Sequence, residues 1–500
     1  MKRLFRRHDV SKLQSQANND VRLRRVLGPV NLTALGVGAI IGTGIFVLTG
    51  TVAAQNSGPA VVLSFVFAGI ASVFAALCYS EFAALVPVAG SAYTYAYATL
   101  GEIFAWIIGW DLILEYAVGA ITVAIGWSGY VVSFFNSIGI HIPAELSAAT
   151  GTLVRLPDGM QVHALFNLPA VVIVFVVTTL LVVGIKHSAL FNNAIVIVKL
   201  AVVLAFIATA AHAVNPANWH PFIPANTGHF GHFGWSGVLA GSGVVFFAYI
   251  GFDAVSTAAQ ESRNPKRDMP IAIISSLVVC TVLYIVVSAI ATGVLPYGEL
   301  DVPDPIAKVA DHAGLGLMVG GVSAMSLMIK LGAIAGLSSV ILVMLLGQSR
   351  VFYAMARDGL LPPFVSRVHP RFKTPWITSI ITGVAVCFFA AVLSIREAGS
   401  LCSIGTLLAF VIVCASVLVL RVREPHHVRT FRTPAIWFVA PAGVVSSLLL
   451  MAGLPWETWA RLIIWFLIGM VVYFGYSHRH SKLHAGCLAQ GEARDESADA

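Results

Sequence analysis

The chain of 500 residues alternates long apolar runs with short polar segments. A helix of about 20 apolar residues crosses the roughly 30 Å hydrocarbon core of a bilayer. Twelve runs of about this length or longer occur, near 30–54, 59–85, 102–135, 166–184, 193–213, 236–258, 270–295, 315–347, 376–395, 399–420, 434–453 and 459–476. The pattern therefore predicts an all-α membrane protein with 12 transmembrane helices and both termini on one side of the membrane.

Lysine and arginine are distributed unequally between the two sides of this predicted topology. The side that holds the termini carries 24 of the 30 Lys and Arg residues. Cytoplasmic loops of membrane proteins are enriched in these residues. We therefore expect a multi-pass protein of the cell inner (plasma) membrane, with both termini in the cytoplasm.

Composition excludes several other classes of protein. Hydrophobic residues make up 58% and charged residues 11%, whereas soluble domains carry about 25% charged residues. The net charge of +7 does not indicate nucleic-acid binding, because the basic residues lie in the loops. The six cysteines show no close metal-type spacing, and the chain carries no zinc motif, phosphate loop or nucleophile–base pair. We expect neither an enzyme nor a protein with a metal or cofactor site.

The first apolar run contains four glycines in the stretch Leu35–Phe46, and Gly42-Thr43-Gly44 concentrates them at one depth. Each glycine lowers helix stability by about 1 kcal/mol relative to alanine. One interpretation is a helix broken in mid-membrane, whose second half directs free N–H groups at an anion such as a carboxylate. The other is that the small residues let a neighbouring helix pack closely.

The sixth run is also interrupted, at Gly251, and carries a carboxylate, Asp253, at membrane depth. Five runs precede it. Because five is an odd number, a second unit that begins with the sixth run would be inverted relative to the first. Paired interrupted helices that open two inverted halves are typical of the central site of a transporter.

Four sequence stretches resemble one known family. They are Gly38–Phe46 in the first run, Pro87–Tyr95 after the second, Gln260–Pro270 after the sixth and Arg350–Pro362 after the eighth. In this order they resemble the amino acid–polyamine–organocation (APC) superfamily. Within it, Gly109–Tyr116 in the third run and a lysine in the fifth resemble bacterial members of the cationic amino acid transporter branch.

The resemblance implies a LeuT-type fold of 5+5 inverted repeats with broken helices 1 and 6. The expected organisation is a cytoplasmic tail (1–29), helices 1–5 (30–213), an extracellular loop (214–235), helices 6–10 (236–421), helices 11–12 (422–476) and a second cytoplasmic tail (477–500).

The resemblance also implies a function and a site. The function is proton-coupled uptake of an L-amino acid by alternating access; the alternative is an exchanger of amino acids or polyamines without net proton coupling. The substrate carboxylate would meet Gly42, Thr43 and Gly44, and its ammonium group the carbonyl groups of Ile40, Phe247 and Ile250. The substrate is expected to be neutral or basic. Its identity, the oligomeric state and any accessory subunit are not predicted.

Lys199 lies about two turns into the fifth run. An ammonium group at that depth is costly and should face the helix bundle. In proton-coupled relatives a lysine of helix 5 replaces the sodium ion that bridges helices 1 and 8 in sodium-coupled relatives, which implies a proton-coupling role for Lys199. The alternative is a lysine that reaches to the cytoplasmic surface.

The acidic residues in the apolar runs can each be interpreted in two ways. Asp253 couples to gating or caps the half-helix that follows it. Glu115 and Asp111 share one face of helix 3; Glu115 relays a proton or meets a basic substrate, or one or both residues brace neighbouring helices. Lys330 is expected to form an ion pair, and Glu81 and Glu102 are expected to be solvated or capping residues.

Overall fold

The computed structural model describes residues 27–85, 91–155, 161–184, 189–257, 262–314, 318–319, 322–372, 374–425 and 429–482. The predicted tails before residue 27 and after residue 482 lie outside these residues. So do positions 86–90 and 258–261, which belong in part to two of the stretches that resemble the APC superfamily.

The described chain is built almost entirely of helices. The α-helices are α2 (Pro29–Ile40), α3 (Thr49–Val52), α4 (Val61–Leu85), α5 (Ser91–Thr99), α6 (Glu102–Ser137), α7 (Leu168–Val183), α8 (Ala189–Ala210), α9 (Gly234–Val245), α10 (Ala254–Thr257), α11 (Pro265–Val294), α12 (Pro305–His312), α13 (Ala324–Arg357), α14 (Trp376–Val392), α15 (Ile395–Arg423), α16 (Ile436–Ala452), α17 (Trp456–Val472) and α18 (His478–His480). Two short antiparallel hairpins pair β1 (Leu153–Arg155) with β2 (Gln161–His163) and β3 (Met318–Val319) with β4 (Val322–Ser323).

Within the described residues, seven helical stretches are long and apolar enough to cross a membrane, and five apolar helices are shorter. The shorter ones include α2 and the stretch Gly234–Tyr249, which are the first segments of the two interrupted runs. These features fit an all-α membrane protein. The count of twelve crossings stays a prediction.

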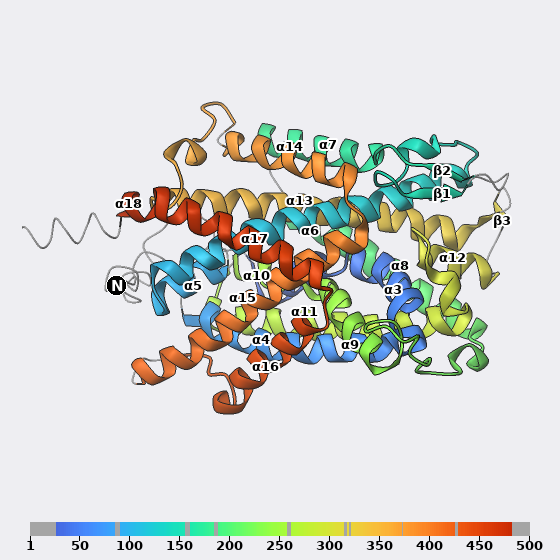
Figure 1. The fold of residues 1–500 in the computed structure, drawn as a ribbon, viewed down its shortest axis with the longest axis horizontal. Helices are drawn as coiled ribbons and strands as arrows, with labels where there is room; N and C mark the ends of the chain where they lie inside the picture. The colour runs from blue at the N-terminus through green and yellow to red at the C-terminus, as the bar shows by residue number, and fades with distance from the viewer. Residues whose placement is uncertain are drawn as a thin grey trace, which may run out of the picture.

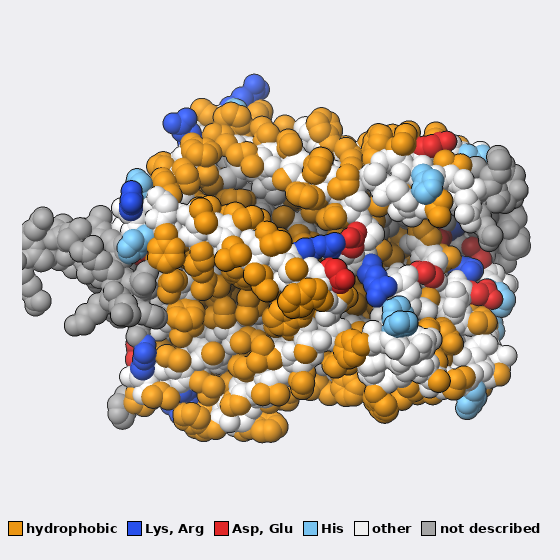
Figure 2. All heavy atoms as spheres, in the orientation of Figure 1, with side chains coloured by type: hydrophobic (Ala, Val, Ile, Leu, Met, Phe, Trp, Pro, Cys, Tyr) orange, Lys and Arg blue, Asp and Glu red, His pale blue; other side chains and the backbone are white. Residues whose placement is uncertain are grey.

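The long helices lie roughly side by side along the longest dimension of the molecule (Figure 1). The β1–β2 hairpin and α12 lie at one end, and α5 and α18 at the other. Hydrophobic side chains cover most of the surface between the two ends, and Lys and Arg side chains gather at the end of α5 and α18 (Figure 2). This surface is the one expected of a protein surrounded by lipid, with its basic side chains at one interface.

Helix α13 differs from the predicted eighth run, 315–347. It begins at Ala324 and continues to Arg357, so Arg350–Arg357 form its last two turns instead of a loop. Alanine, methionine and arginine in this segment favour helix. The chain leaves the helix just before Gly359, whose positive φ of 83° suits a residue without a side chain.

Glu81 is buried, so the prediction of a solvated or capping residue is wrong for it. Its carboxylate lies 2.9 Å from Arg421 Nε and 3.2 Å from Arg429 Nε, and it accepts a hydrogen bond from the Thr433 N–H. These partners come from residues about 340–350 positions later in the chain. The pairing joins α4 to the end of α15 at the side of the molecule that we expect to face the cytoplasm.

Glu102 is buried as well, so solvation is excluded for it too. Its carboxylate accepts hydrogen bonds from three hydroxyl groups, those of Tyr97, Tyr473 and Ser481. Lys330, whose partner the sequence did not identify, lies 3.8 Å from Asp304 and donates a hydrogen bond to Ser137. It therefore joins α13 to α6 and to the segment before α12.

Candidate functional site

The first interrupted helix changes direction at Ile41 and Gly42. Helix α2 ends at Ile40, and Ile41 is extended with φ −71° and ψ 100°. The chain resumes as a π-helical turn from Gly44 to Leu48, followed by α3. The backbone around Gly42 therefore does not continue a regular helical ladder. This is the break of the first of the two interpretations of these glycines.

The second interrupted helix breaks at Ile250 and Gly251. Helix α9 passes into a 3₁₀ turn, Phe246–Tyr249, after which Ile250 is extended and Gly251 takes a positive φ of 118°. Glycine adopts this conformation without the steric cost that a side chain would bring. Short helix α10 follows with Asp253 just before it.

The two breaks touch each other through glycine. A methyl group added at Gly44 would come within 2.2 Å of the Ala248 Cβ atom, and one at Gly251 within 3.0 Å of the Ala39 backbone. The distance at Gly44 is too short for any side chain, and the distance at Gly251 is tighter than nearly all real contacts of a Cβ atom. The glycines therefore serve both interpretations of the sequence, because they interrupt the helices and let the two interrupted segments pack closely.

Tyr284 of α11 connects the two breaks and was not identified from the sequence. Its hydroxyl oxygen lies 2.8 Å from the carbonyl oxygen of Ile40 and 2.8 Å from that of Ala248. Both carbonyl groups have lost part of the helical ladder that would otherwise satisfy them. Nothing in the local sequence around Tyr284 distinguishes it, because its partners belong to other helices.

Replacing Tyr284 by phenylalanine is expected to weaken this connection without changing the shape of the side chain. A buried acceptor that loses its donor costs about 1–3 kcal/mol. We expect a lower unfolding temperature and slower uptake, measured by thermal unfolding of purified protein and by transport in liposomes. Tyr353→Phe is the matched control, because Tyr353 is an exposed tyrosine. Equal effects of the two substitutions would contradict the role given to Tyr284.

All six predicted substrate-binding residues line one cavity. Ile40, Gly42, Thr43 and Gly44 come from the first break, and Phe247 and Ile250 from the second. The cavity is small, about 10 Å³, which is about the volume that one water molecule needs. In this conformation it is therefore closed to an amino acid. Whether these residues contact a substrate stays a prediction.

The remaining wall of the cavity is apolar. It is formed by Ala39 together with Val123 of α6 and by Val340 and Met344 of α13. Val123, Val340 and Met344 could not be selected from the sequence, because each lies in an unbroken apolar helix. None of the ten residues that line the cavity carries a charged side chain.

Thr43 supplies a polar side chain at this cavity. Its hydroxyl is fully buried and has no hydrogen-bond partner among the described residues. Its side chain packs against Gly126 of α6, where a methyl group would come within 2.7 Å of it. Buried hydroxyl groups are usually hydrogen-bonded, so a ligand that brings a polar atom to this point would meet a group that can donate or accept.

Lys199 of α8 points into the bundle and not to the cytoplasmic surface. It is 1% exposed, and its ammonium group donates hydrogen bonds to the carbonyl groups of Gly38 (2.8 Å) and Ile41 (3.1 Å). Its methylene groups lie against Gly336 of α13. Lys199 thus lies between the end of α2 and α13, which are helices 1 and 8 in the predicted numbering. Its role in proton coupling is not tested by this geometry.

The acidic residues form a separate group beside the broken helices. Asp253 and Glu115 are both buried, and Asp253 accepts a hydrogen bond from Tyr116 at 3.3 Å. Asp111 lies one turn before Glu115 on α6 and is equally buried. The structure therefore brings Asp253 of the second break close to the acidic face of α6.

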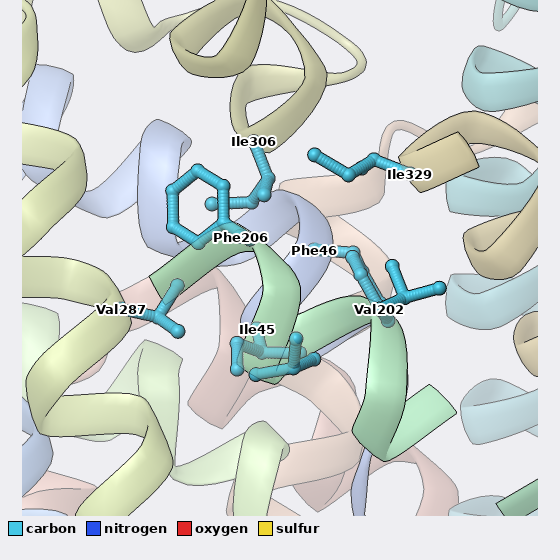
Figure 3. Close-up of a pocket in the computed structure, with 8 residues that line it drawn as sticks. Ile45, Phe46, Val202, Phe206, Val287, Ile306 and Ile329 are labelled. Atoms are coloured by element: carbon cyan, nitrogen blue, oxygen red, sulfur yellow. The ribbon is translucent and has the colours of Figure 1, made fainter. Parts of the chain in front are cut away.

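A second cavity lies beside the turn that follows the first break and is apolar throughout (Figure 3). Its walls come from five parts of the chain, and they are Ile45, Phe46, Val202, Val203, Phe206, Val287, Ile306 and Ile329. Ile306 belongs to α12 and Ile45 to the turn after the first break. With no polar group in its wall, this cavity does not suit a zwitterion.

The comparisons with known proteins agree on one family. The sequence model of the amino acid permease family matches residues 27–475. The chain therefore belongs to this family, and it is an APC superfamily amino acid permease. A branched-chain amino acid permease, BcaP, of Bacillus subtilis (strain 168) is 47% identical over 96% of this chain and 99% of its own length.

Other relatives carry different names. A methylthioribose transporter of Bacillus subtilis (strain 168) is 43% identical over 97% of this chain and 100% of its own length. The vacuolar cationic amino acid transporter 4 of Arabidopsis thaliana is 37% identical over 86% of this chain and 68% of its own length. The family is that of a multi-pass membrane transporter, and the relatives differ in the substrate that their names give.

Proposed function

We propose that this protein takes up a neutral, apolar L-amino acid together with a proton, by alternating access. The observation that carries the proposal is the cavity between the two breaks. The backbone of Gly42, Thr43 and Gly44 and the unpaired Thr43 hydroxyl lie at one side of it, and the apolar side chains of Val123, Val340 and Met344 at another. A zwitterion with an apolar side chain is complementary to both sides of the cavity.

The charges of the substrate would be bound by backbone groups. N–H groups at Gly42, Thr43 and Gly44 suit a carboxylate, because a helix start carries unpaired donors and partial positive charge. Carbonyl groups at Ile40, Phe247 and Ile250 suit an ammonium group. The absence of a charged side chain among the ten residues of the wall favours a neutral substrate over a basic one. The name of one relative, a branched-chain amino acid permease, supports the same choice.

The proposed architecture is the twelve-helix LeuT-type fold with two inverted repeats of five helices. The contact between the breaks supports it, because each break lies in the helix that would open one repeat. Helices 1, 2, 6 and 7 would rock against the rest. Lys199 would couple this motion to the proton gradient, since its ammonium group bonds to the end of α2 and its stem packs on α13.

A binding screen followed by transport tests the proposal. Purified protein is heated with single amino acids, methylthioribose or polyamines, and leucine, isoleucine and valine are expected to raise the unfolding temperature most. In liposomes without internal substrate, an inward proton gradient should then drive accumulation of the same amino acids. Stabilisation by arginine or methylthioribose alone would overturn the substrate class. Uptake that requires internal substrate would overturn proton coupling in favour of exchange.

A further inference from the structure

The buried face of α6 carries two carboxyl groups that the substrate cavity does not use. Asp111 and Glu115 are each 1% exposed. Both carboxyl oxygens of Asp111, and Oε1 of Glu115, have no hydrogen-bond partner among the described residues. Buried polar atoms are nearly always hydrogen-bonded, so these three oxygens need an explanation.

Both side chains point into the interface between α6 and α15. A methyl group added at Gly405 of α15 would come within 2.8 Å of Asp111 Oδ1. The Thr406 hydroxyl lies beside Glu115, and the Cys402 thiol donates a hydrogen bond to the Glu115 backbone carbonyl. Gly405 thus leaves room for the Asp111 carboxyl group, and the two acidic side chains share one narrow space.

The groups that face this pair are neutral or negative. Cys402 and Thr406 lie on α15, Tyr79 on α4 and Tyr116 on α6 itself, and the charge of Asp253 is close enough to act on Glu115. Arg350 of α13 is a basic group near Tyr116, but it forms no ion pair with either carboxyl group. Among the described residues, no Lys or Arg pairs with Asp111 or Glu115.

Two ionised carboxylates one helical turn apart repel each other, and each is costly to bury without a partner. Like-charged carboxyl groups in a shared site are relieved when one of them takes up a proton. We propose that Asp111 and Glu115 form a proton-binding pair that holds at least one proton inside the membrane. The step is a reversible transfer of a proton from water to a carboxylate oxygen, with no other co-reactant.

The position of the pair connects it to the transport cycle. Glu115 lies eight residues, about two helical turns, before Val123, which lines the substrate cavity on the same helix. Asp253, which follows the second break, accepts a hydrogen bond from Tyr116, the residue next to Glu115 on α6. Only this connection to transport rests on the proposed function, because the presence of the proton can be measured without transport.

Infrared spectroscopy tests the proton directly. At neutral pH, purified wild-type protein is expected to show the carbonyl stretching band of a protonated carboxylic acid. The band should be lost or shifted in Asp111→Asn and in Glu115→Gln, and unchanged in Glu457→Gln, which alters an exposed carboxylate of α17. A wild-type spectrum without the band would overturn the proposal even if neither variant folds, and so would a band that both variants leave unchanged.

The pH profile of uptake tests the role of Asp111 beside Glu115. Replacing Asp111 by asparagine keeps the shape and removes a neighbouring negative charge, so Glu115 should give up its proton more readily. The midpoint of the profile should then move to lower pH, whereas a structural brace would lower the rate equally at every pH. An unmoved midpoint would contradict the proposal. Loss of all proton-driven uptake in wild-type protein would instead contradict the proposed function and leave the infrared result standing.

Discussion

Replacing Lys199 by alanine is expected to abolish uptake driven by a proton gradient, down to the level of liposomes without protein, while the protein still reaches the membrane. The ammonium group donates to the carbonyl groups of Gly38 and Ile41 at the end of α2. Alanine leaves both acceptors unpaired, at about 1–3 kcal/mol each. The substitution also removes the methylene groups of Lys199 that pack against Gly336 of α13.

Two controls separate coupling from folding in this experiment. Lys308→Ala removes a half-exposed lysine of α12 and should leave uptake unchanged. Stabilisation of the Lys199→Ala protein by its amino acid should persist if the cavity is intact. Normal proton-driven uptake by Lys199→Ala would remove this residue from the mechanism, and uptake by exchange alone would assign it to proton coupling and not to substrate binding.

Replacing Gly44 by alanine is expected to reduce uptake at least about tenfold, because the added methyl group would lie 2.2 Å from the Ala248 Cβ atom and 2.4 Å from its Cα atom. Overpacking of this kind typically costs about 1–3 kcal/mol, and about 1.4 kcal/mol corresponds to a factor of ten. The two broken segments would have to separate, which disturbs both ends of the cavity at once.

Gly399→Ala is the matched control, since its added methyl group would lie 3.6 Å from Leu48 in ordinary contact. Uptake and thermal unfolding are measured for both variants. The contact between the breaks would be of no consequence if Gly44→Ala transported as fast as Gly399→Ala.

The two breaks were predictable because each depends on residues that are neighbours in the sequence. Gly42-Thr43-Gly44 and Gly251 weaken a helix wherever they occur, and an apolar run around them fixes the depth of the weakness. The residues predicted for the cavity followed from these local features and from the family resemblance. The structure brings all six to one place.

Other parts of the site could not be predicted, because they depend on which helices become neighbours. Tyr284, Val123 and Met344 lie in regular apolar helices and face the breaks only after folding. The ion pairs of Glu81 could not be predicted, because its basic partners, Arg421 and Arg429, lie far along the chain. Periodicity and composition describe a helix, but they do not identify the helix against which it packs.

The phenol of Tyr284 carries a single hydrogen, yet two main-chain oxygens compete for it, one from each unwound segment. A protonated amine carries three hydrogens. An amino acid that enters with its amine toward Ile40 could supply a donor to one oxygen and leave the phenol to the other. Binding of the amino acid would then strengthen the hydrogen bonds between the two unwound segments, so that the filled site would affect both halves of the molecule.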